Sequence, residues 1–279
     1  PFVFELRDLW PESIRAVGAL RSAWILRWLE RLELYLYRKA ALIVAVTESF
    51  RDNLVGRGIP RQSIQVVTNG VDLSRFSPMH KDARLVDELG LGGKFVLGYV
   101  GTHGLAHGLE TILDAAEMLL AGDDADRFAF VMLGDGARKK ALQSDAARRA
   151  LRNVVFIDSV PKGEVVRYWS LLDASIIHLS PYALFETVIP SKLFESMGIG
   201  IPVLLGVKGE AARVVTQHGV GICIEPGNAH ALVAGIRQLS GSPAVIASLR
   251  KACLAAAPRF DRSRLAMSML ESLVALKAS

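Results

Sequence analysis

Short runs of branched and aromatic apolar residues recur along the chain, and most are followed by a glycine-bearing loop and a stretch of helical periodicity. Apolar runs of about four to eight residues are typical of strands buried on both faces, whereas apolar residues three and four apart indicate an amphipathic helix. Strands are predicted at 2–6, 41–46, 64–68, 95–100, 128–133, 154–157, 174–179, 202–206 and 221–224. Helices are predicted at 21–40, 48–57, 81–89, 107–121, 137–151, 164–172, 190–198, 228–239 and from 262 onward.

This alternation of strand and helix predicts an α/β fold, with parallel sheets joined by right-handed crossovers. Residues 73–93 are polar and glycine-bearing, so we interpret them as a linker between a first domain at 1–72 and a second at 94–257, followed by a final helix at 258–279. Ligands of such sheets bind at the carboxyl ends of the strands, where the glycine-bearing loops lie. The chain opens on Pro1 and enters a buried strand at once, which we interpret as a cut inside the first domain.

The amino-acid composition is typical of a folded globular protein. Hydrophobic residues make up 51% of the chain and charged residues 22%, as in folded globular proteins. The two cysteines, Cys223 and Cys253, provide neither a disulfide framework nor a metal-binding spacing, so the expected location is a reducing cytoplasm. No apolar run approaches the about 20 residues that a spanning helix needs, and we expect no signal peptide.

The net charge of +5 is mild, and the basic residues gather in two segments. The segment 138–152 has no aromatic residue among its basic ones, so we interpret it as a solvated helix face and expect no nucleic-acid partner. The helix at 21–39 instead places Trp24 and Trp28 beside five basic residues. Two interpretations stay open for it, a helix packed on the core with solvated arginines, or a helix resting on an anionic membrane surface.

The stretch at 186–206 is the richest in candidate chemistry. Pro190 suits a first helical turn and Ser191 can cap its free N–H groups, so a short helix is predicted to begin there. Lys192 and Glu195 share a face of that helix. A helix amino end beside a lysine attracts anions, and a carboxylate one turn in can accept hydrogen bonds from sugar hydroxyls, which suits a nucleotide sugar. The alternative is an ordinary strand–helix element with a charged outer face.

Glycine-bearing loops follow other predicted strands. The loop Gly101-Thr-His-Gly104 has the strand–loop–helix layout that places a diphosphate on backbone N–H groups, although many such turns bind nothing. Gly134 and Asp135 begin a second tight loop. His103 and His107 have helical spacing but straddle a glycine, so we do not expect a zinc site there.

The segment 186–203 contains Glu186, then Pro190-Ser-Lys-Leu-Phe-Glu195, then Gly200-Ile-Pro-Val. This arrangement resembles the two-glutamate signature of retaining glycosyltransferases of family 4 (glycosyl transferases group 1), which have the GT-B fold. Seven residues separate the glutamates in that family and eight do so here, which places Thr187 at the strictly matching position. Asn69-Gly-Val-Asp72 resembles the family's hinge. The 101–104 loop and the Asp-Leu-Trp-Pro-Glu turn are most similar to a branch that builds bacterial surface polysaccharides, including fucosamine-type transferases.

The resemblance implies two Rossmann-like parallel-sheet domains, the first incomplete, with the last helix crossing back to the first domain. It also implies that Glu186 is catalytic and faces the donor sugar, that Glu195 holds the ribose hydroxyls, and that main chain in the loop after the strand at 154–157 holds the base. Lys192 and the 101–104 loop would face the diphosphate. The implied donor-binding residues are Gly101, Thr102, His103, Gly104, Gly134, Asp135, Val160, Pro161, Lys192, Glu195, Gly209 and Glu210. The family uses no bound metal, so we expect neither a metal nor a cofactor.

The function implied by the resemblance is transfer of a sugar, with retention, from a nucleotide-sugar donor (UDP-linked by expectation) to a lipid-linked or saccharide acceptor. Such a protein would work in the cytoplasm or on the inner face of the membrane, in bacterial surface polysaccharide synthesis. A nucleotide-sugar 2-epimerase of the same fold and a non-catalytic nucleotide-sugar binding module remain alternatives. We expect the 279-residue chain alone to bind donor weakly and to transfer nothing.

Overall fold

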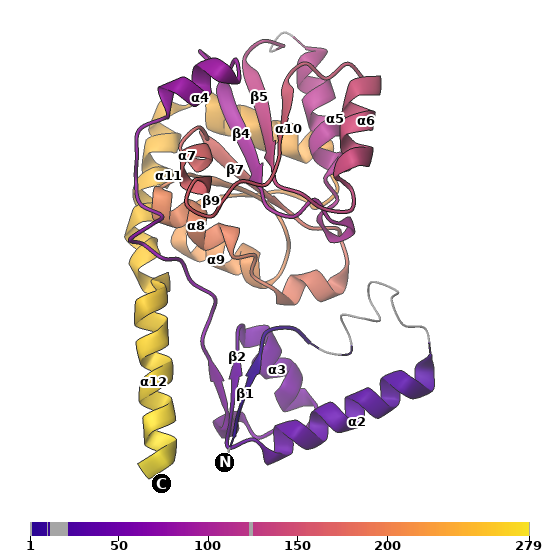
Figure 1. Cartoon of the computed structure of the whole chain (residues 1–279), viewed down its shortest axis with the longest axis vertical. Coiled ribbons are helices and arrows are strands. Elements are labelled where there is room, and N and C mark those ends of the chain that lie inside the picture. Colours follow the sequence, from indigo (N-terminus) through magenta and orange to yellow (C-terminus); the bar gives the residue numbers. More distant parts are fainter. Residues whose placement is uncertain (1, 10, 12–21, 123–124, 279) are drawn as a thin grey trace.

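The computed structural model describes residues 2–9, 11, 22–122 and 125–278, and it contains two parallel sheets, one above the other, with a long helix along one side (Figure 1). The sheets confirm the predicted α/β class. Two residues of the Asp-Leu-Trp-Pro-Glu turn, at positions 10 and 12, lie outside the described residues.

The first sheet has three parallel strands in the order β1-β2-β3. Its second helix, α3, begins where the sequence predicts, because Thr47 adopts an extended conformation and its hydroxyl accepts a hydrogen bond from the N–H of Phe50 at 3.1 Å. The elements of this part are β1 (Val3–Leu6), α2 (Ala23–Lys39), β2 (Leu42–Ala45), α3 (Glu48–Gly56) and β3 (Ile64–Val66).

The second sheet has six parallel strands in the order β6-β5-β4-β7-β8-β9. Its strands are β4 (Phe95–Val100), β5 (Phe128–Leu133), β6 (Val154–Ile157), β7 (Ala174–His178), β8 (Val203–Gly206) and β9 (Gly221–Cys223). Its helices are α4 (Ala83–Glu88), α5 (Glu110–Leu120), α6 (Lys139–Arg148), α7 (Val165–Trp169), α8 (Lys192–Ile199), α9 (Glu210–His218), α10 (Ala229–Ser240) and α11 (Pro243–Ala256). The order reverses between β4 and β7, which in open sheets of this kind is where ligands bind.

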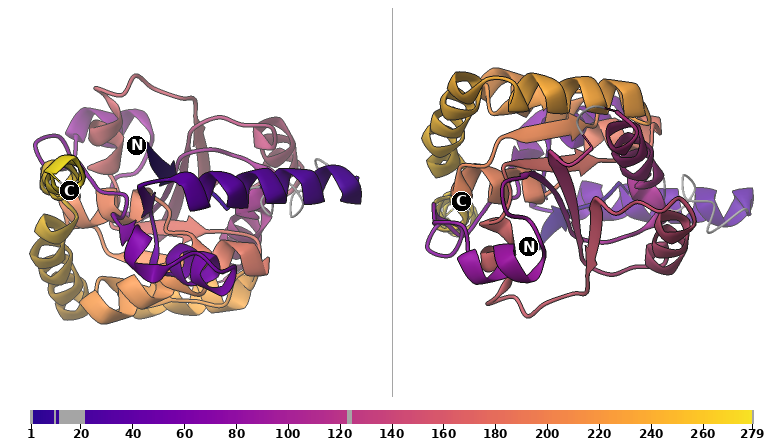
Figure 2. Two further views of the ribbon diagram at one scale, coloured as in Figure 1. Left: turned by 90° about the horizontal axis from the view of Figure 1, so that it is seen from below. Right: turned by 90° about the horizontal axis from the view of Figure 1, so that it is seen from above.

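Two hydrophobic clusters cover the two faces of the second sheet. One cluster joins the sheet to α7, α8, α9 and α11, and the other joins it to α5, α6 and α10. Views from below and above show the sheet between these helical layers (Figure 2). Because both faces are covered, the loops at the carboxyl ends of the strands are left at the sheet edge, which faces the first sheet (Figure 1).

The chain between the two sheets is paired with the beginning of the last helix, α12 (Arg262–Ala278). Val71 donates its N–H to the carbonyl of Phe260 and accepts from the N–H of Arg262, both at 2.9 Å. Gly70 is required here, because a Cβ atom on it would lie 2.4 Å from the carbonyl oxygen of Phe260. From this pairing α12 runs away from the second sheet and alongside the first (Figure 1).

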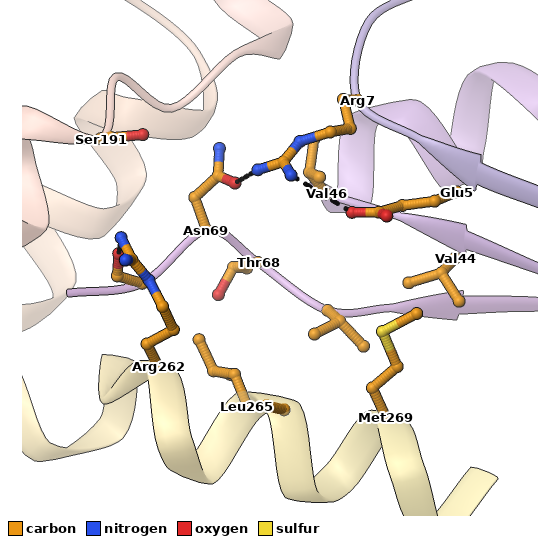
Figure 3. Close-up of a pocket in the computed structure, with 13 residues that line it drawn as sticks. Glu5, Arg7, Val44, Val46, Thr68, Asn69, Ser191, Arg262, Leu265 and Met269 are labelled. Atoms are coloured by element: carbon orange, nitrogen blue, oxygen red, sulfur yellow. Dashed lines mark hydrogen bonds and ion pairs between the residues drawn. The ribbon is translucent and has the colours of Figure 1, made fainter. Parts of the chain in front are cut away.

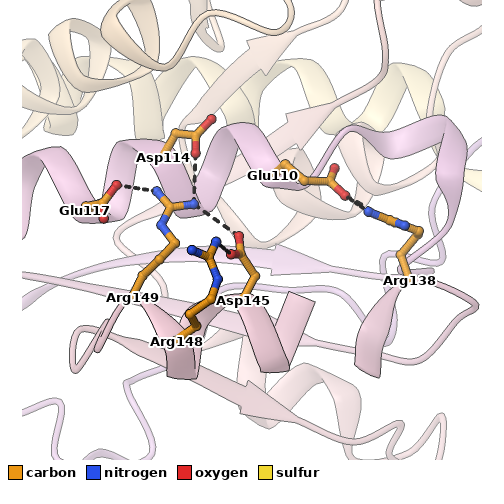
Figure 4. A network of polar contacts seen from close by, with 7 residues as sticks. All are labelled: Glu110, Asp114, Glu117, Arg138, Asp145, Arg148 and Arg149. Carbon is orange, nitrogen blue, oxygen red and sulfur yellow. Dashed lines mark hydrogen bonds and ion pairs between the residues drawn. The ribbon is translucent and has the colours of Figure 1, made fainter. Parts of the chain in front are cut away.

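The basic segment after β5 is held in ion pairs rather than left free. The guanidinium of Arg149 contacts Asp114 at 2.9 Å, Glu117 at 2.6 Å and Asp145 at 3.2 Å, so it joins α6 to α5 (Figure 4). Arg138 pairs with Glu110 in the same network. These ion pairs join α6 to α5.

The helix α2 packs on the first sheet, but not through its tryptophan-bearing side. The stripe on α2 that a core-facing helix would bury is in solvent, with Trp24 62% exposed, Trp28 63% and Tyr35 57%. The opposite side of α2 is the one that packs inward, through Leu26, Glu33 and Tyr37. The aromatic side chains therefore form an outer face.

Candidate functional site

The loops after β4 and β5 lie in direct backbone contact at the carboxyl edge of the second sheet. Gly134 has a φ of +139°, and a Cβ atom on it would lie 2.0 Å from the carbonyl oxygen of Gly101. A Cβ atom on Gly136 would lie 2.5 Å from the carbonyl oxygen of His103. Glycine is therefore required at these two positions, and main chain rather than side chains lines this part of the edge.

Lys192 brings a positive charge to the same loop. Its ammonium nitrogen is buried without a hydrogen-bond partner among the described residues, and it lies 3.8 Å from the centroid of the Tyr99 ring. The nitrogen is also 3.1 Å from the position that a Cβ atom on Gly101 would occupy. Burial lowers the pKa of Lys192 to about 7, while the nearby Glu195 carboxylate acts in the opposite direction. A cation at a glycine loop and a helix amino end is an arrangement that binds phosphate.

Two histidines complete the surroundings of the Tyr99 ring. The imidazole of His103 stacks on it with centroids 5.7 Å apart, and that of His107 meets it edge-on at 5.9 Å. Burial, with the positive charge of nearby lysines, lowers the pKa of each histidine to about 4, so both are neutral at pH 7. His103 is fully buried, its N–H donates to the carbonyl of Asp135 at 2.8 Å, and its carbonyl accepts from the N–H of Arg138 at 2.9 Å. Its contact with a donor stays a prediction.

Glu195 lies in the first turn of α8, as predicted, and is partly buried. Burial raises the pKa of this carboxyl group, and the positive charges of Lys192, Arg262 and Arg75 lower it. The sequence did not indicate the two arginines, because they come from α12 and from the segment after the hinge. The neighbouring Ser191 is a correction: its backbone is already helical and its side chain makes no capping hydrogen bond.

Glu186 lies in a 3-10 helix, Ala183–Thr187, and is exposed. Its carbonyl oxygen is 2.0 Å from where a Cβ atom on Gly209 would be, so Gly209 lies directly against it. The hydroxyl of Thr187 is occupied within the same turn, where it donates to the carbonyl of Leu184 at 2.7 Å. Of the two candidates for the first glutamate position, Glu186 is the one with a free side chain at the sheet edge.

Glu210 makes a contact between the two domains. Its side chain is buried and turned toward the first domain, where it accepts a hydrogen bond from the N–H of Ser49 at 2.6 Å. The second carboxylate oxygen pairs with Arg213 at 2.8 Å. Its predicted role beside the donor stays a prediction.

The remaining predicted residues lie on loops of the same edge. Thr102 and Asp135 are exposed, and the Asp135 carboxylate accepts from the N–H of Gly136 at 2.7 Å. Val160 and Pro161 follow β6, and the Pro161 carbonyl accepts from the N–H of Glu164 at 2.8 Å. The structure thus places these residues at one edge, while their contact with a donor stays a prediction.

Two buried residues that hold these loops in place were not predicted from the sequence. Lys139 donates to the carbonyls of Gly134 at 2.7 Å and Ile157 at 3.1 Å, and it also contacts Asp158. His178, at the end of β7, accepts from the N–H of Gly227 at 2.9 Å through Nε2, so its Nδ1 carries the proton and donates to the carbonyl of His107 at 2.7 Å. A polar residue at the carboxyl end of an otherwise apolar strand is the signal that could have identified His178.

A cavity of about 480 Å³ lies between the hinge, α12, the first sheet and the amino end of α8 (Figure 3). Arg7 enters it from the end of β1 and donates to the side chain of Asn69 at 2.9 Å. Ser191 borders it next to Lys192.

The described part of the chain contains no group of three or more His, Cys, Asp or Glu side chains that could hold a metal. The described helices are also too short or too polar to span a membrane.

Two parallel sheets whose loops face each other across a hinge define the GT-B class of fold. The chain belongs to the family Glycosyl transferases group 1, whose model matches residues 83–259. The model of Glycosyltransferase Family 4 matches residues 1–75.

Two curated relatives are provisionally described as glycosyltransferases. WcaI of Escherichia coli (strain K12), for colanic acid biosynthesis, is 27% identical over 210 residues, which cover 70% of this chain and 48% of that protein. WbjE of Pseudomonas aeruginosa is 23% identical over 235 residues, which cover 83% of this chain and 58% of that protein. The chain spans about half the length of the curated relatives it matches.

Among solved structures, the chain is similar to HepE of Anabaena in complex with UDP. The TM-score is 0.82 at 20% identity, over 99% of this chain and 72% of that one. The same protein with UDP-glucose gives a TM-score of 0.80 at 21% identity, over 99% of this chain and 72% of that one. At such identity the likeness concerns the fold alone.

Proposed function

We propose that this chain is the donor-binding part of a retaining glycosyltransferase that takes a sugar from a nucleotide sugar. The observation that carries the proposal is the buried, unpartnered ammonium of Lys192 against Gly101, three residues before Glu195 on α8. A buried cation without a partner is costly, and an incoming diphosphate would supply the missing negative charge.

We assign a role to each of these residues from its position in the site. Lys192, the amino end of α8 and the 101–104 loop hold the diphosphate, Glu195 accepts from the ribose hydroxyls, and Glu186 faces the sugar. Transfer with retention requires stabilisation of the departing nucleoside diphosphate and of an oxocarbenium-like sugar, which is electrostatic work done by preorganised charges. The cavity next to Ser191 is the place proposed for the acceptor.

Donor and acceptor are proposed by likeness. UDP is the proposed nucleotide because HepE, of the same fold, has been solved with UDP and with UDP-glucose. Main chain near Val160 and Pro161 is proposed to hold the base. A lipid-linked or saccharide acceptor in bacterial surface polysaccharide synthesis is proposed because WcaI is described for colanic acid biosynthesis.

We place the protein at the cytoplasmic face of the membrane, with the exposed aromatic face of α2 against anionic lipid. Trp24 and Trp28 lie beside Arg27 and Arg31 on this helix, and indole rings with basic side chains suit such an interface.

The test uses the full-length protein that contains this chain, a panel of UDP- and GDP-linked sugars, and lipid-linked and saccharide acceptors. We expect a transferred sugar with its anomeric configuration retained, in the presence of EDTA as well as in its absence. Epimerised free sugar would indicate the 2-epimerase instead, and binding without turnover would indicate a binding module. Loss of transfer with EDTA and its return with magnesium would contradict the assigned phosphate contacts.

A further inference from the structure

Three hydrogen bonds join the first domain to the second at the amino end of α3, one of them from the guanidinium of Arg213 to the Ser49 hydroxyl at 3.3 Å. The hydroxyl of Thr47 donates to the carbonyl oxygen of Thr187 at 2.9 Å, between residues 140 positions apart in sequence. The N–H of Ser49 donates to Oε1 of Glu210 at 2.6 Å, across 161 positions. Thr47 is 1% exposed and Glu210 is 5% exposed, and both bonds are partly buried, so water competes for them less than at the surface.

Glu210 caps a helix that belongs to the other domain. The N–H groups in the first turn of α3 have no partners within the helix, and the two that matter here are taken by Thr47, at 3.1 Å from the N–H of Phe50, and by Glu210. A carboxylate is also favourable at the positive end of the helix dipole. Glu210 also pairs with Arg213 of its own helix at 2.8 Å, so the N–H of Ser49 is the partner that the first domain adds.

The segment that carries Glu186 is held between these contacts. On one side its carbonyl lies against Gly209, which has a φ of +69° and no room for a Cβ atom. On the other side the next carbonyl, that of Thr187, accepts from Thr47 of the first domain. Gly209 directly precedes Glu210, so the same short loop touches both the Glu186 main chain and α3.

We propose that Thr47 and Glu210 are positioning residues, which fix the 186–187 segment in its working place only when the two domains are in contact. The inference rests on the proposed function, in which Glu186 faces the donor sugar. It follows that donor affinity and turnover depend on different residues. The loops around Lys192 and Glu195 determine donor affinity, whereas the amino end of α3 determines the rate of transfer. A misplacement of about 1 Å at a reacting group can cost about a hundredfold in rate.

The central variant is Thr47→Val in the full-length protein, which keeps the shape of the side chain and removes the hydroxyl. We expect kcat to fall by about ten- to a hundredfold, with the dissociation constant of UDP unchanged within about twofold. Thr47→Ser keeps the hydroxyl and should restore most of kcat. Thr111→Val is the matched control, because Thr111 is also buried but lies on α5, away from the domain contact.

The inference is overturned if Thr47→Val leaves kcat unchanged, if it weakens UDP binding as much as it lowers kcat, or if Thr47→Ser is as impaired as Thr47→Val. A merely structural cap would lower the melting temperature in Thr47→Val and leave the kcat of the folded protein intact.

Hydrogen exchange provides a readout that does not depend on catalysis. In Glu210→Ala we expect faster exchange at the amide of Ser49, and in Thr47→Val faster exchange in the 185–188 segment, each relative to Thr111→Val. If the unaltered protein transfers no sugar, the proposed function fails, while this exchange result still decides whether the contact positions the segment. Unchanged exchange in both variants would overturn the inference by itself.

Discussion

The ammonium group of Lys192 has no hydrogen-bond partner among the described residues. It lies beside Gly101, in the glycine-bearing loop at 101–104. Its Nζ rests on the Tyr99 ring, a contact that stabilises the ammonium less than an anion would. The neighbouring histidines are neutral at pH 7, so they add no repulsion. At this scale the site is prepared for a negative ligand.

Donor binding is therefore expected to depend on pH. In the free protein burial holds the pKa of Lys192 at about 7, and a bound diphosphate would move it back toward the usual value of 10.5. Above pH 7 binding must then take up a proton, so donor affinity should fall as pH rises from 7 toward 10, by up to about tenfold per pH unit. Calorimetry at pH 8 in buffers of different ionisation enthalpy should detect this proton uptake.

The control for that experiment is Lys192→Met, which keeps the length of the side chain without its charge. This variant should bind UDP more weakly and should lose the pH dependence. Equal affinity of the unaltered protein at pH 7 and pH 9 would contradict the role given to Lys192.

Two single substitutions can decide whether Glu186 or Thr187 occupies the first-glutamate position of the motif. Glu186→Ala should lower kcat by about a hundredfold or more with little change in donor KM, because a contact to the reacting sugar matters most in the transition state. Thr187→Ala should have the smaller effect on kcat, since its hydroxyl is occupied by Leu184 within the turn. Steady-state kinetics of both variants give the answer. A silent Glu186→Ala beside a damaging Thr187→Ala would place the catalytic contact at position 187.

Among the elements, strands were the easiest to predict from sequence. The strands at 95–100, 128–133 and 154–157 are found at the predicted residues, because each is a continuous apolar run that ends at a loop. Helix boundaries were less accurate. The helix expected from position 107 begins at Glu110, since Gly108 with a φ of +54° separates it from a 3-10 turn.

Two helices, α9 and α11, were not predicted at all. The stretch at 210–218 mixes charged and apolar residues after a glycine and resembles a loop. The stretch at 243–256 follows another helix without an intervening strand, so the alternation that guided the prediction gave no signal there. For the site, sequence spacing predicted that Lys192 and Glu195 share a helix. It could not predict Arg262 or Thr47 as neighbours of the site, nor the contact of Glu210 with Ser49, because those contacts depend on how distant segments pack.

The pairing of the hinge with α12 gives a prediction at the level of elements. Gly70→Ala would place a methyl group 2.4 Å from the Phe260 carbonyl oxygen and 2.7 Å from a Leu265 methyl carbon. We expect a loss of about 1–3 kcal/mol in the free energy of unfolding, as for other overpacked positions. Thermal unfolding measures it. Gly56→Ala is the control, because no atom lies within 4 Å of the added methyl group, and it should be neutral or slightly stabilising.

At the scale of the whole molecule, two surfaces are proposed to bind other molecules, one a nucleotide sugar and the other a membrane. The carboxyl edge of the second sheet faces the first domain, and α2 presents its aromatic face to solvent beyond the first sheet (Figure 1). The sequence left the direction of α2 open, because a helix with tryptophans and arginines fits both a core and an interface.

The membrane proposal gives the prediction at this scale. The full-length protein should co-sediment with liposomes that contain anionic lipid at low salt, and the bound fraction should fall with added salt. Trp24→Ala combined with Trp28→Ala should reduce binding several-fold, because each indole contributes buried apolar area at the interface. Met79→Ala, also an exposed apolar side chain, should have no effect. No binding of the unaltered protein at low salt would contradict the proposal.

The central claim, that the carboxyl edge of the second sheet binds a nucleotide sugar, is tested most directly by calorimetric titration of UDP-glucose into the full-length protein and its Glu195→Ala variant. Each charge-assisted hydrogen bond from a ribose hydroxyl contributes about 1.5–3 kcal/mol, so the variant should bind about ten- to a thousandfold more weakly. Glu88→Ala, on the surface of α4, should bind as the unaltered protein does. Equal affinity of Glu195→Ala and the unaltered protein would contradict the account.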